Sequence, residues 1–146
     1  MNKNIIIVDI DGTISNVGDR LKYLECKDWD SFFEACDQDE PILEIIEIIK
    51  YMRAKYQIYF CTARPEYTRK KTFDWINKHV GFAATHRILM RADDDFRHDA
   101  EVKPELVRDA GIDFDDILFV LEDRVSMVAK WRELGVNCLQ VADGNF

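Results

Sequence analysis

Five short runs of apolar residues recur along the chain, separated by longer segments in which apolar and polar residues mix. The runs lie at residues 5–9, 58–61, 87–90, 117–121 and 137–141. They are too short for helices, and most are rich in Ile, Val, Leu and Phe, which is typical of strands; the first, with four β-branched residues in a row, is expected to be buried on both faces. We therefore predict five strands of a buried sheet.

Segments between these runs predict helices. In the segment 41–52, apolar residues recur at helical spacing and Pro41 suits the first helical position. Three further helices are expected at 65–80, 103–110 and 124–134, followed by Gly81, Gly111 and Gly135. Alternation of strands and helices predicts an α/β protein, a three-layer α/β/α Rossmann-like fold with a mainly parallel central sheet.

The segment at about 14–40 does not follow this alternation. Only residues 29–36 suggest a short helix there, so we expect a small cap insertion over the end of the first strand. Its aromatic residues Trp29, Phe32 and Phe33 have the spacing of side chains that anchor an insertion, although such rings can also stack on bases. With 146 residues and no linker or repeat, residues 1–146 are expected to form a single domain.

Composition and charge narrow the class of protein. The net charge of −8 disfavours nonspecific binding to nucleic acid or to an anionic membrane. No apolar run approaches 18 residues, so no membrane span is expected. The chain opens directly on a strand without a signal-peptide pattern, and its four cysteines are scattered, so we expect reduced thiols and a cytoplasmic location.

Polar side chains gather where the predicted strands end. Asp9 and Asp11 follow the first strand, and Thr62, Ala63 and Arg64 follow the second. Glu122 and Asp123 follow the fourth, and Lys103 is expected at a helix start just before it. Because ligands of open parallel sheets bind at the carboxyl ends of the strands, these groups are expected to converge.

Several carboxylates cannot lie close together unless a positive charge compensates them. Oxygen ligands, waters and substrate phosphate suit Mg²⁺. Lys103 and the hydroxyl of Thr62 suit a phosphate group. In such a site Asp9 can attack phosphorus and form an aspartyl-phosphate, while Asp11 protonates the leaving oxygen and then activates water. The set therefore predicts phosphoryl transfer.

In their order along the chain these motifs resemble the haloacid dehalogenase superfamily. The matching residues are Asp-Ile-Asp-Gly-Thr at 9–13, Thr-Ala-Arg at 62–64, Lys103, and Glu-Asp at 122–123. The resemblance implies a nucleophile at Asp9, an acid–base at Asp11, and phosphate ligands at Thr62 and Lys103. It also implies that Asp9, the carbonyl of Asp11 and Asp123 hold Mg²⁺.

Longer stretches are similar to the 3′-phosphatase half of bacteriophage polynucleotide kinase-phosphatase. These are Cys-Thr-Ala-Arg at 61–64 and the segments 91–103 and 121–146. The resemblance implies roles in substrate handling or catalysis for Arg20, Arg64, Arg91 and Arg97. Where the phage family has two aspartates, this chain has Glu122 before Asp123, and Glu122 is a further candidate metal ligand. No G-x-x-x-x-G-K-[ST] motif is present, so no kinase half is expected.

The function predicted from these observations is an Mg²⁺-dependent phosphomonoesterase with an aspartyl-phosphate intermediate, acting as a polynucleotide 3′-phosphatase. One alternative is a nucleotidase or another small-molecule phosphatase, which the acidic net charge favours. Another is a phosphate-binding module without turnover. The expected partner is a phosphorylated nucleic-acid end or a nucleotide, with no membrane partner, and the sequence leaves the oligomeric state open.

Overall fold

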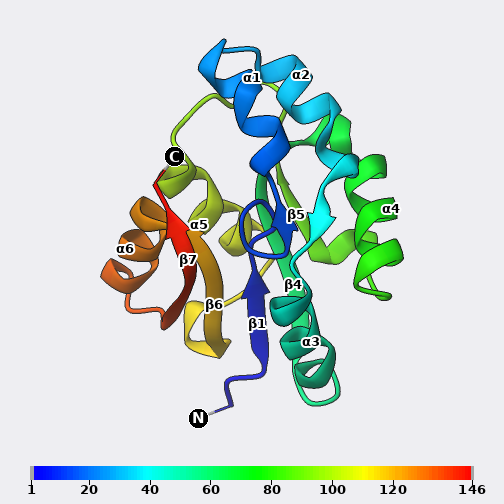
Figure 1. Ribbon diagram of the computed structural model, residues 1–146. Helices are drawn as coiled ribbons and strands as arrows, with labels where there is room; N and C mark the ends of the chain where they lie inside the picture. Colours follow the sequence, from blue (N-terminus) through cyan, green and yellow to red (C-terminus); the bar gives the residue numbers. More distant parts are fainter. Residues whose placement is uncertain (1, 146) are drawn as a thin grey trace.

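The computed structural model describes residues 2–145 and is built on a five-stranded parallel sheet (Figure 1). The strand order is β5-β4-β1-β6-β7, and each neighbouring pair runs parallel. The five strands are β1 (Ile5–Val8), β4 (Gln57–Pro65), β5 (Ile88–Arg91), β6 (Ile117–Arg124) and β7 (Cys138–Gly144). The predicted parallel sheet is thereby confirmed, since each of these five strands overlaps one of the expected runs.

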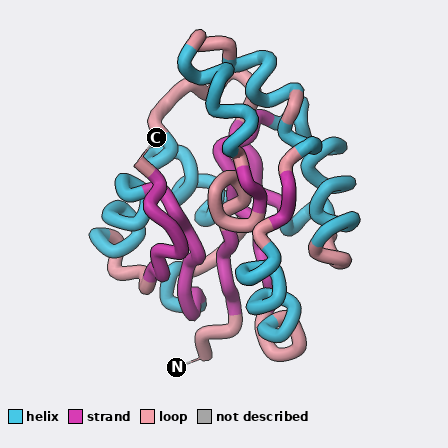
Figure 2. The backbone as a smooth tube through the Cα atoms, in the orientation of Figure 1, coloured by secondary structure: helices cyan, strands magenta, loops and turns pink. Residues whose placement is uncertain are grey.

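Helices cover both faces of the sheet and complete the three layers (Figures 1 and 2). Two of them, α3 (Leu43–Met52) and α4 (Arg69–His79), cover one face. The other face carries α5 (Asp99–Asp109) and α6 (Val125–Glu133). Single 3₁₀ turns lie at Glu66–Thr68, Thr85–Arg87 and Phe114–Asp116. The fold is therefore the α/β/α sandwich that the alternation of elements predicted.

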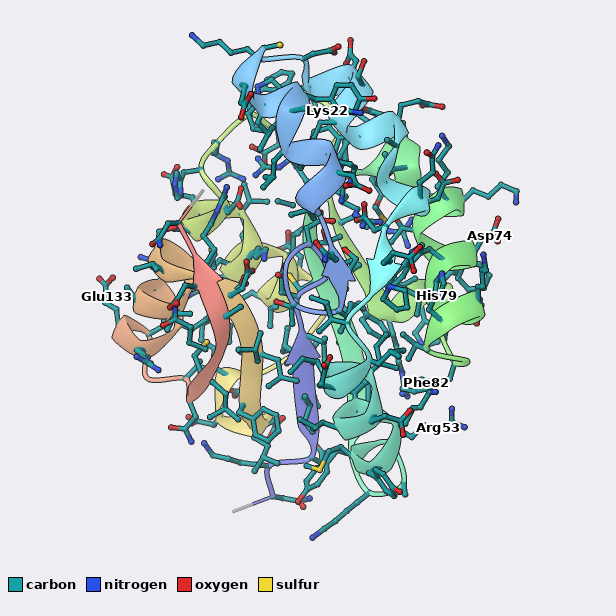
Figure 3. The ribbon with its side chains drawn as sticks, in the orientation of Figure 1. Lys22, Arg53, Asp74, His79, Phe82 and Glu133 are labelled. Carbon is teal, nitrogen blue, oxygen red and sulfur yellow. The ribbon has the colours of Figure 1, made fainter. Side chains whose placement is uncertain are left out.

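The core is divided in two by the central strand. Ile6 and Val8 of β1 pack towards α3 and α4, whereas Ile5 and Ile7 pack towards α5 and α6. All four are buried, which explains why β1 is apolar at every position. At the border of the first core the guanidinium of Arg53 lies 4.3 Å from the ring centre of Phe82, and both side chains are labelled in Figure 3.

The insertion lies between β1 and α3, above the carboxyl edge of the sheet (Figure 1). A two-residue antiparallel pair, β2 (Ser15–Asn16) and β3 (Glu40–Pro41), closes its base. Above this pair lie two short helices, α1 (Leu21–Glu25) and α2 (Trp29–Glu34), with 3₁₀ turns at Gly18–Arg20 and Cys36–Gln38. The helix expected at 29–36 is present and ends two residues earlier, whereas α1 had not been predicted.

Three helix starts that were predicted from nearby prolines are wrong. Helix α5 begins at Asp99 rather than at Lys103, because His98 caps it and Asp99 and Glu101 occupy its first turn. Pro104 therefore lies inside the helix. Similarly, Pro41 belongs to β3 and Pro65 ends β4, so that α3 and α4 begin two and four residues later. Strand β7 also runs to Gly144 instead of residue 141.

The chain order defines a switch point beside β1. From β1 the chain builds β4 and β5 on one side, then returns to build β6 and β7 on the other. The carboxyl ends of β1 and β6 therefore flank the crevice at which open α/β sheets bind ligands. Within residues 2–145, no helix is both long and apolar enough to cross a membrane.

Candidate active site

The site begins at a tight turn after β1. The amides of Thr13, Ile14 and Ser15 all donate to the carbonyl of Ile10, at 3.0–3.1 Å. Gly12 adopts a φ of 86°, and a Cβ at this position would lie 2.1 Å from a carboxylate oxygen of Asp123. A side chain at residue 12 is therefore excluded both by backbone conformation and by the approach of β6.

Three buried carboxylates converge at the switch point. Asp9 follows β1, and Glu122 and Asp123 end β6. One ligand atom from each lies within 4.8 Å of the others. The hydroxyl of Thr13 donates to Asp9 Oδ2 at 2.9 Å, which fixes the orientation of that carboxylate. The convergence expected from the strand ends is therefore present for these three residues, which we call the acidic cluster.

Lys103 is the cation of this cluster. It projects from the second turn of α5, and its Nζ lies 2.7 Å from Asp9 Oδ1 and 2.8 Å from Glu122 Oε2. Glu122 also accepts through Oε1 from the amide of Asp123 at 3.2 Å. Because Lys103 lies inside the helix, its contribution comes from the ammonium group rather than from the free amides of a helix start.

The acidic cluster is short of positive charge. Burial, followed by the charge of Asp9, raises the pKa of Asp123 to about 7 and that of Glu122 well above its usual range. Burial alone would lower the pKa of Lys103, but Asp9 and Glu122 outweigh it and raise that pKa. Three carboxylates facing one ammonium suit a hard divalent cation with oxygen ligands. A Cβ at residue 144 would lie 2.5 Å from Asp123 Oδ2. The glycine at this position therefore leaves space for the Asp123 carboxylate.

Asp11 lies in a second cluster. Its carboxylate faces two buried arginines, with Oδ1 2.7 Å from Nη2 of Arg64 and 2.6 Å from Nη2 of Arg20. Burial would raise the pKa of Asp11, but Arg64 and then Arg20 hold it well below its usual range. The Asp11 carboxylate is therefore ionised and turned towards arginines rather than towards the acidic cluster.

Asp39 completes this second cluster and connects it to the insertion. Arg20 donates from Nε and Nη2 to the two oxygens of Asp39, at 2.7 and 2.6 Å, and from Nη1 to the carbonyl of Phe32 at 3.0 Å. Asp39 Oδ2 also lies 3.6 Å from Nη2 of Arg64. We call Asp11, Arg20, Asp39 and Arg64 the arginine cluster. It links the acid–base candidate to both ends of the insertion.

A cavity of about 750 Å³ lies above the acidic cluster. Asp9, Asp11, Thr62, Lys103 and Asp123 all line it. Among its described lining residues neither Arg20 nor Arg64 occurs, and both side chains are almost fully buried. These two arginines therefore contact Asp11 and not the space in which a ligand would lie.

The other predicted substrate residues take different places at the cavity. Thr62 is buried, and its Oγ1 accepts from the amide of Arg64 at 3.1 Å. The carbonyl of Ala63 accepts from Nε of Arg91 at 3.1 Å. Arg91 also donates to the carbonyls of Asp95 and Arg97 at 2.9 and 2.6 Å, so it fastens the loop 92–98 to β4.

Arg97 lies at the rim and is half-exposed, paired with Asp95 and Glu105. Sequence reasoning assigned no catalytic or binding role to Thr13 or Asp39, and it took Asp99 to be part of a solvated loop rather than of a second metal site. Asp99 Oδ1 lies 2.6 Å from Nη2 of Arg91, and the same carboxylate forms an ion pair with Arg124. Asp99 therefore connects two arginines of the cavity wall. Thr13 could have been identified from its place in the motif of residues 9–13. No local pattern distinguishes Asp39 or Asp99 from the other acidic residues.

Structural comparison places this architecture in a known class. A haloacid dehalogenase-like hydrolase from Streptococcus pneumoniae matches with a TM-score of 0.68 over 95% of this chain and 84% of that chain, at 12% identity, which shows the fold. The chain therefore has the fold of the haloacid dehalogenase-like hydrolases. The family match that follows shows that it is a phosphatase of this type, a phosphoric monoester hydrolase.

More specifically, residues 3–146 match the family model of the polynucleotide kinase PNKP phosphatase domain, and the chain belongs to that family. A chain of a Pnkp1/Rnl/Hen1 complex is similar at 28% identity and a TM-score of 0.81, covering 99% of this chain and 47% of that chain. A chain of the Pnkp1/Rnl/Hen1 RNA repair complex is similar at 27% identity and a TM-score of 0.82, covering 98% of this chain and 44% of that chain. This chain thus spans about half the length of those two.

Proposed function

We propose that this domain is an Mg²⁺-dependent phosphomonoesterase that removes the 3′-phosphate from a nucleic-acid end. The observation that carries the proposal is the acidic cluster with Lys103 at the floor of a cavity of about 750 Å³. Membership of the PNKP phosphatase family supports the choice of a nucleic-acid end. We further propose that residues 1–146 form a single domain, with the insertion at about 14–40 as its cap.

In the first step Asp9 attacks phosphorus and forms an aspartyl-phosphate. Its Oδ1 contacts Lys103 and its Oδ2 contacts Thr13, so both partners hold the carboxylate in place before attack. The ammonium group of Lys103 then stabilises the negative charge that develops on the oxygens of the transferring phosphoryl group. Thr62 lines the same cavity and is placed to donate from its hydroxyl or amide to the phosphate.

Asp11 is the acid and base of this proposal. In the structure its carboxylate is held by Arg20 and Arg64. To protonate the leaving oxygen it must take up a proton, and the two arginines oppose this because they stabilise the ionised form. We therefore propose that Arg20 and Arg64 position Asp11, and that part of this contact is released when substrate enters. Microscopic reversibility then assigns the activation of water to the same carboxylate.

The donor set supports a divalent cation, and we propose Mg²⁺. Asp9, Asp123 and the main-chain carbonyl of Asp11 would hold it, with Glu122 as a further ligand or as the anchor of Lys103. When bound, Mg²⁺ neutralises charge on the phosphoryl group. Arg97 at the rim and Arg91 in the cavity wall would meet the phosphates of a longer substrate.

The test is phosphate release in the presence of Mg²⁺ from four substrates. These are an oligonucleotide with a 3′-phosphate, the same strand with a 5′-phosphate, and the 3′- and 5′-mononucleotides. The strand should be made both as DNA and as RNA, since one similar chain belongs to an RNA repair complex. Preference for the 3′-phosphorylated strand is the expected result.

Preference for mononucleotides would instead support a nucleotidase, which the acidic net charge of −8 favours. Failure to release phosphate from any substrate would support a binding module without turnover.

The thiols of Cys36, Cys61 and Cys138 are free and buried. On the basis of these free thiols we propose a reducing, cytoplasmic setting.

A further inference from the structure

Aromatic side chains form part of the wall of the catalytic cavity. The insertion contributes Trp29, Phe32 and Phe33, and the loop between β5 and α5 contributes Phe96. The rings of Trp29 and Phe33 are stacked, with centroids 6.0 Å apart and planes 26° from parallel. The insertion and this loop lie at the same end of the molecule, above the carboxyl edge of the sheet (Figures 1 and 2).

These rings differ in how far they are buried, and the difference separates two roles. Phe32 is only 5% exposed and lies under the guanidinium of Arg20 at 4.4 Å, so it anchors the insertion. By contrast, Trp29 is 53% and Phe96 is 90% exposed. Anchoring does not account for two large rings that stay exposed while they line the same cavity as Asp9.

Charge does not supply the binding energy for a nucleic acid in this cavity. Eight lining residues are acidic, namely Asp9, Asp11, Asp30, Asp93, Asp95, Asp99, Glu122 and Asp123, and four are basic, namely Arg91, Arg97, Lys103 and Arg124. A cation bound at the acidic cluster would offset part of this excess of acidic residues. The loop between β5 and α5 adds further carboxylates, which such a cation would not offset. A polyanionic strand therefore needs an uncharged contact, and the face of an aromatic ring offers one to any base.

We propose that Trp29, supported by Phe33, and Phe96 form a stacking subsite for the nucleobase next to the scissile 3′-phosphate. The proposal rests on the proposed function and adds to it the part of the substrate that is recognised. Arg91 fastens the loop that carries Phe96, through the carbonyls of Asp95 and Arg97, so the loop is held at the cavity. Stacking is tolerant of base identity, so the subsite selects a nucleotide end without selecting its sequence.

The test compares two 3′-phosphorylated oligonucleotides of identical length. One ends in an ordinary nucleotide, and in the other the terminal nucleotide lacks its base. We expect the wild-type kcat/KM to be roughly 5- to 150-fold higher for the first, the range that stacking on one base gives. This factor should be the same at low and at moderate salt, because stacking involves no counterion release. Equal kcat/KM for both substrates would overturn the subsite.

Trp29→Ala should lower kcat/KM for the ordinary strand roughly tenfold and leave the abasic strand unchanged. Trp29→Phe should retain most of the activity. Phe96→Ala provides a second variant at a side chain so exposed that the fold does not depend on it. Tyr51→Ala, an 80% exposed ring of α3 that is not among the described cavity residues, is the matched control. Equal losses on both strands in Trp29→Ala and in Phe96→Ala would contradict the proposal.

A binding measurement separates this proposal from the proposed function. Trp75 and Trp131 are 2% and 0% exposed, so Trp29 is the indole that a ligand can quench. An oligonucleotide that ends in a base should quench the fluorescence, and its abasic counterpart should not. Quenching without phosphate release from any substrate would support the subsite and reject the proposed function. Phosphate release without base-dependent quenching would reject the subsite alone.

Discussion

The two buried clusters beneath the cavity contain similar residues in opposite electrostatic balance. In the acidic cluster, Lys103 is the one cation that the described residues place among Asp9, Glu122 and Asp123, so acidic groups outnumber basic ones. In the arginine cluster Asp11 and Asp39 face Arg20 and Arg64, and the charges cancel. The pKa of Asp123 is consequently raised to about 7, whereas the pKa of Asp11 is lowered.

The difference explains what each cluster can do. A set of carboxylates with too few cations attracts a metal cation, and that cation can in turn bind an anionic phosphate, so the acidic cluster is suited to binding and transfer. A neutral set with saturated hydrogen bonds is rigid and fixes the position of one carboxylate. Under the proposed mechanism the acidic cluster reacts with the phosphate, and the arginine cluster holds Asp11 in place until substrate arrives.

The largest expected effect comes from removing the nucleophile. Asp9→Asn should lower kcat roughly 10⁴-fold or more, since no other carboxylate of the acidic cluster takes its place. It also removes one of three mutually repelling charges, so the thermal midpoint should not fall. Steady-state phosphate release and a melting curve provide the measurements, with the exposed Asp109→Asn as the matched control. Substantial residual turnover in Asp9→Asn would reject the covalent mechanism.

Asp11→Asn should have the next largest effect. Loss of a general acid lowers kcat by about 10²–10⁴-fold when the leaving group is an alkoxide such as a sugar oxygen. The loss should be much smaller with p-nitrophenyl phosphate, whose leaving group needs no proton. Comparing kcat for the two substrates therefore tests the role directly, and an equal loss on both would assign Asp11 a structural role only.

Removing one cation from the arginine cluster should mainly affect stability. Arg64→Met leaves Asp11 and Asp39 with Arg20 alone, and breaking a buried pair of this kind costs about 3–5 kcal/mol. Urea unfolding gives the free energy directly. Arg69→Met is the matched control, because Arg69 pairs with Glu66 at the surface and should cost no more than about 1 kcal/mol. Similar costs for both variants would contradict the contrast.

A divalent cation should stabilise the protein more at pH 8 than at pH 5. Because the pKa of Asp123 rises from 3.8 to about 7 on folding, the metal-free folded state holds the extra proton between these values. Its stability should therefore decrease as pH rises through that window. At pH 8 Asp123 is ionised, and Mg²⁺ at 100 times its Kd adds about 2.7 kcal/mol, or roughly 5–10 °C. Melting curves with Mg²⁺ or chelator test this, and equal shifts at both pH values would contradict it.

The smallest expected effect concerns the hydroxyl that orients the nucleophile. Thr13→Val keeps the volume and removes the hydrogen bond to Asp9 Oδ2, worth about 1.5–3 kcal/mol when the acceptor is charged. We expect kcat to fall by roughly ten- to a hundredfold with little change in KM. Thr13→Ser should restore most of kcat, and failure of this rescue would indicate that the methyl group matters instead.

Local pattern was sufficient for the sheet and for part of the site. Runs such as residues 5–8 and 117–121 were identifiable as strands because the central strands of such a sheet are covered on both faces and are apolar at consecutive positions. The ends of these runs then located Asp9 and Asp123, because parallel strands place their carboxyl ends at one edge. Proline was less informative, since it is tolerated at the end of β4 and inside α5 as well as at a helix start.

Local pattern was therefore enough to predict the fold class, the place of the proposed nucleophile Asp9, and the convergence of Asp9, Glu122 and Asp123. The electrostatic balance of the two clusters, by contrast, depends on contacts between distant parts of the chain. Asp11 follows Asp9 by two residues, yet its carboxylate faces Arg20, Arg64 and the neighbourhood of Asp39. The pairing of Arg64 with Asp11 spans 53 positions of the chain. Such long-range contacts set the pKa values of buried groups, and these depend on distances that no local pattern encodes.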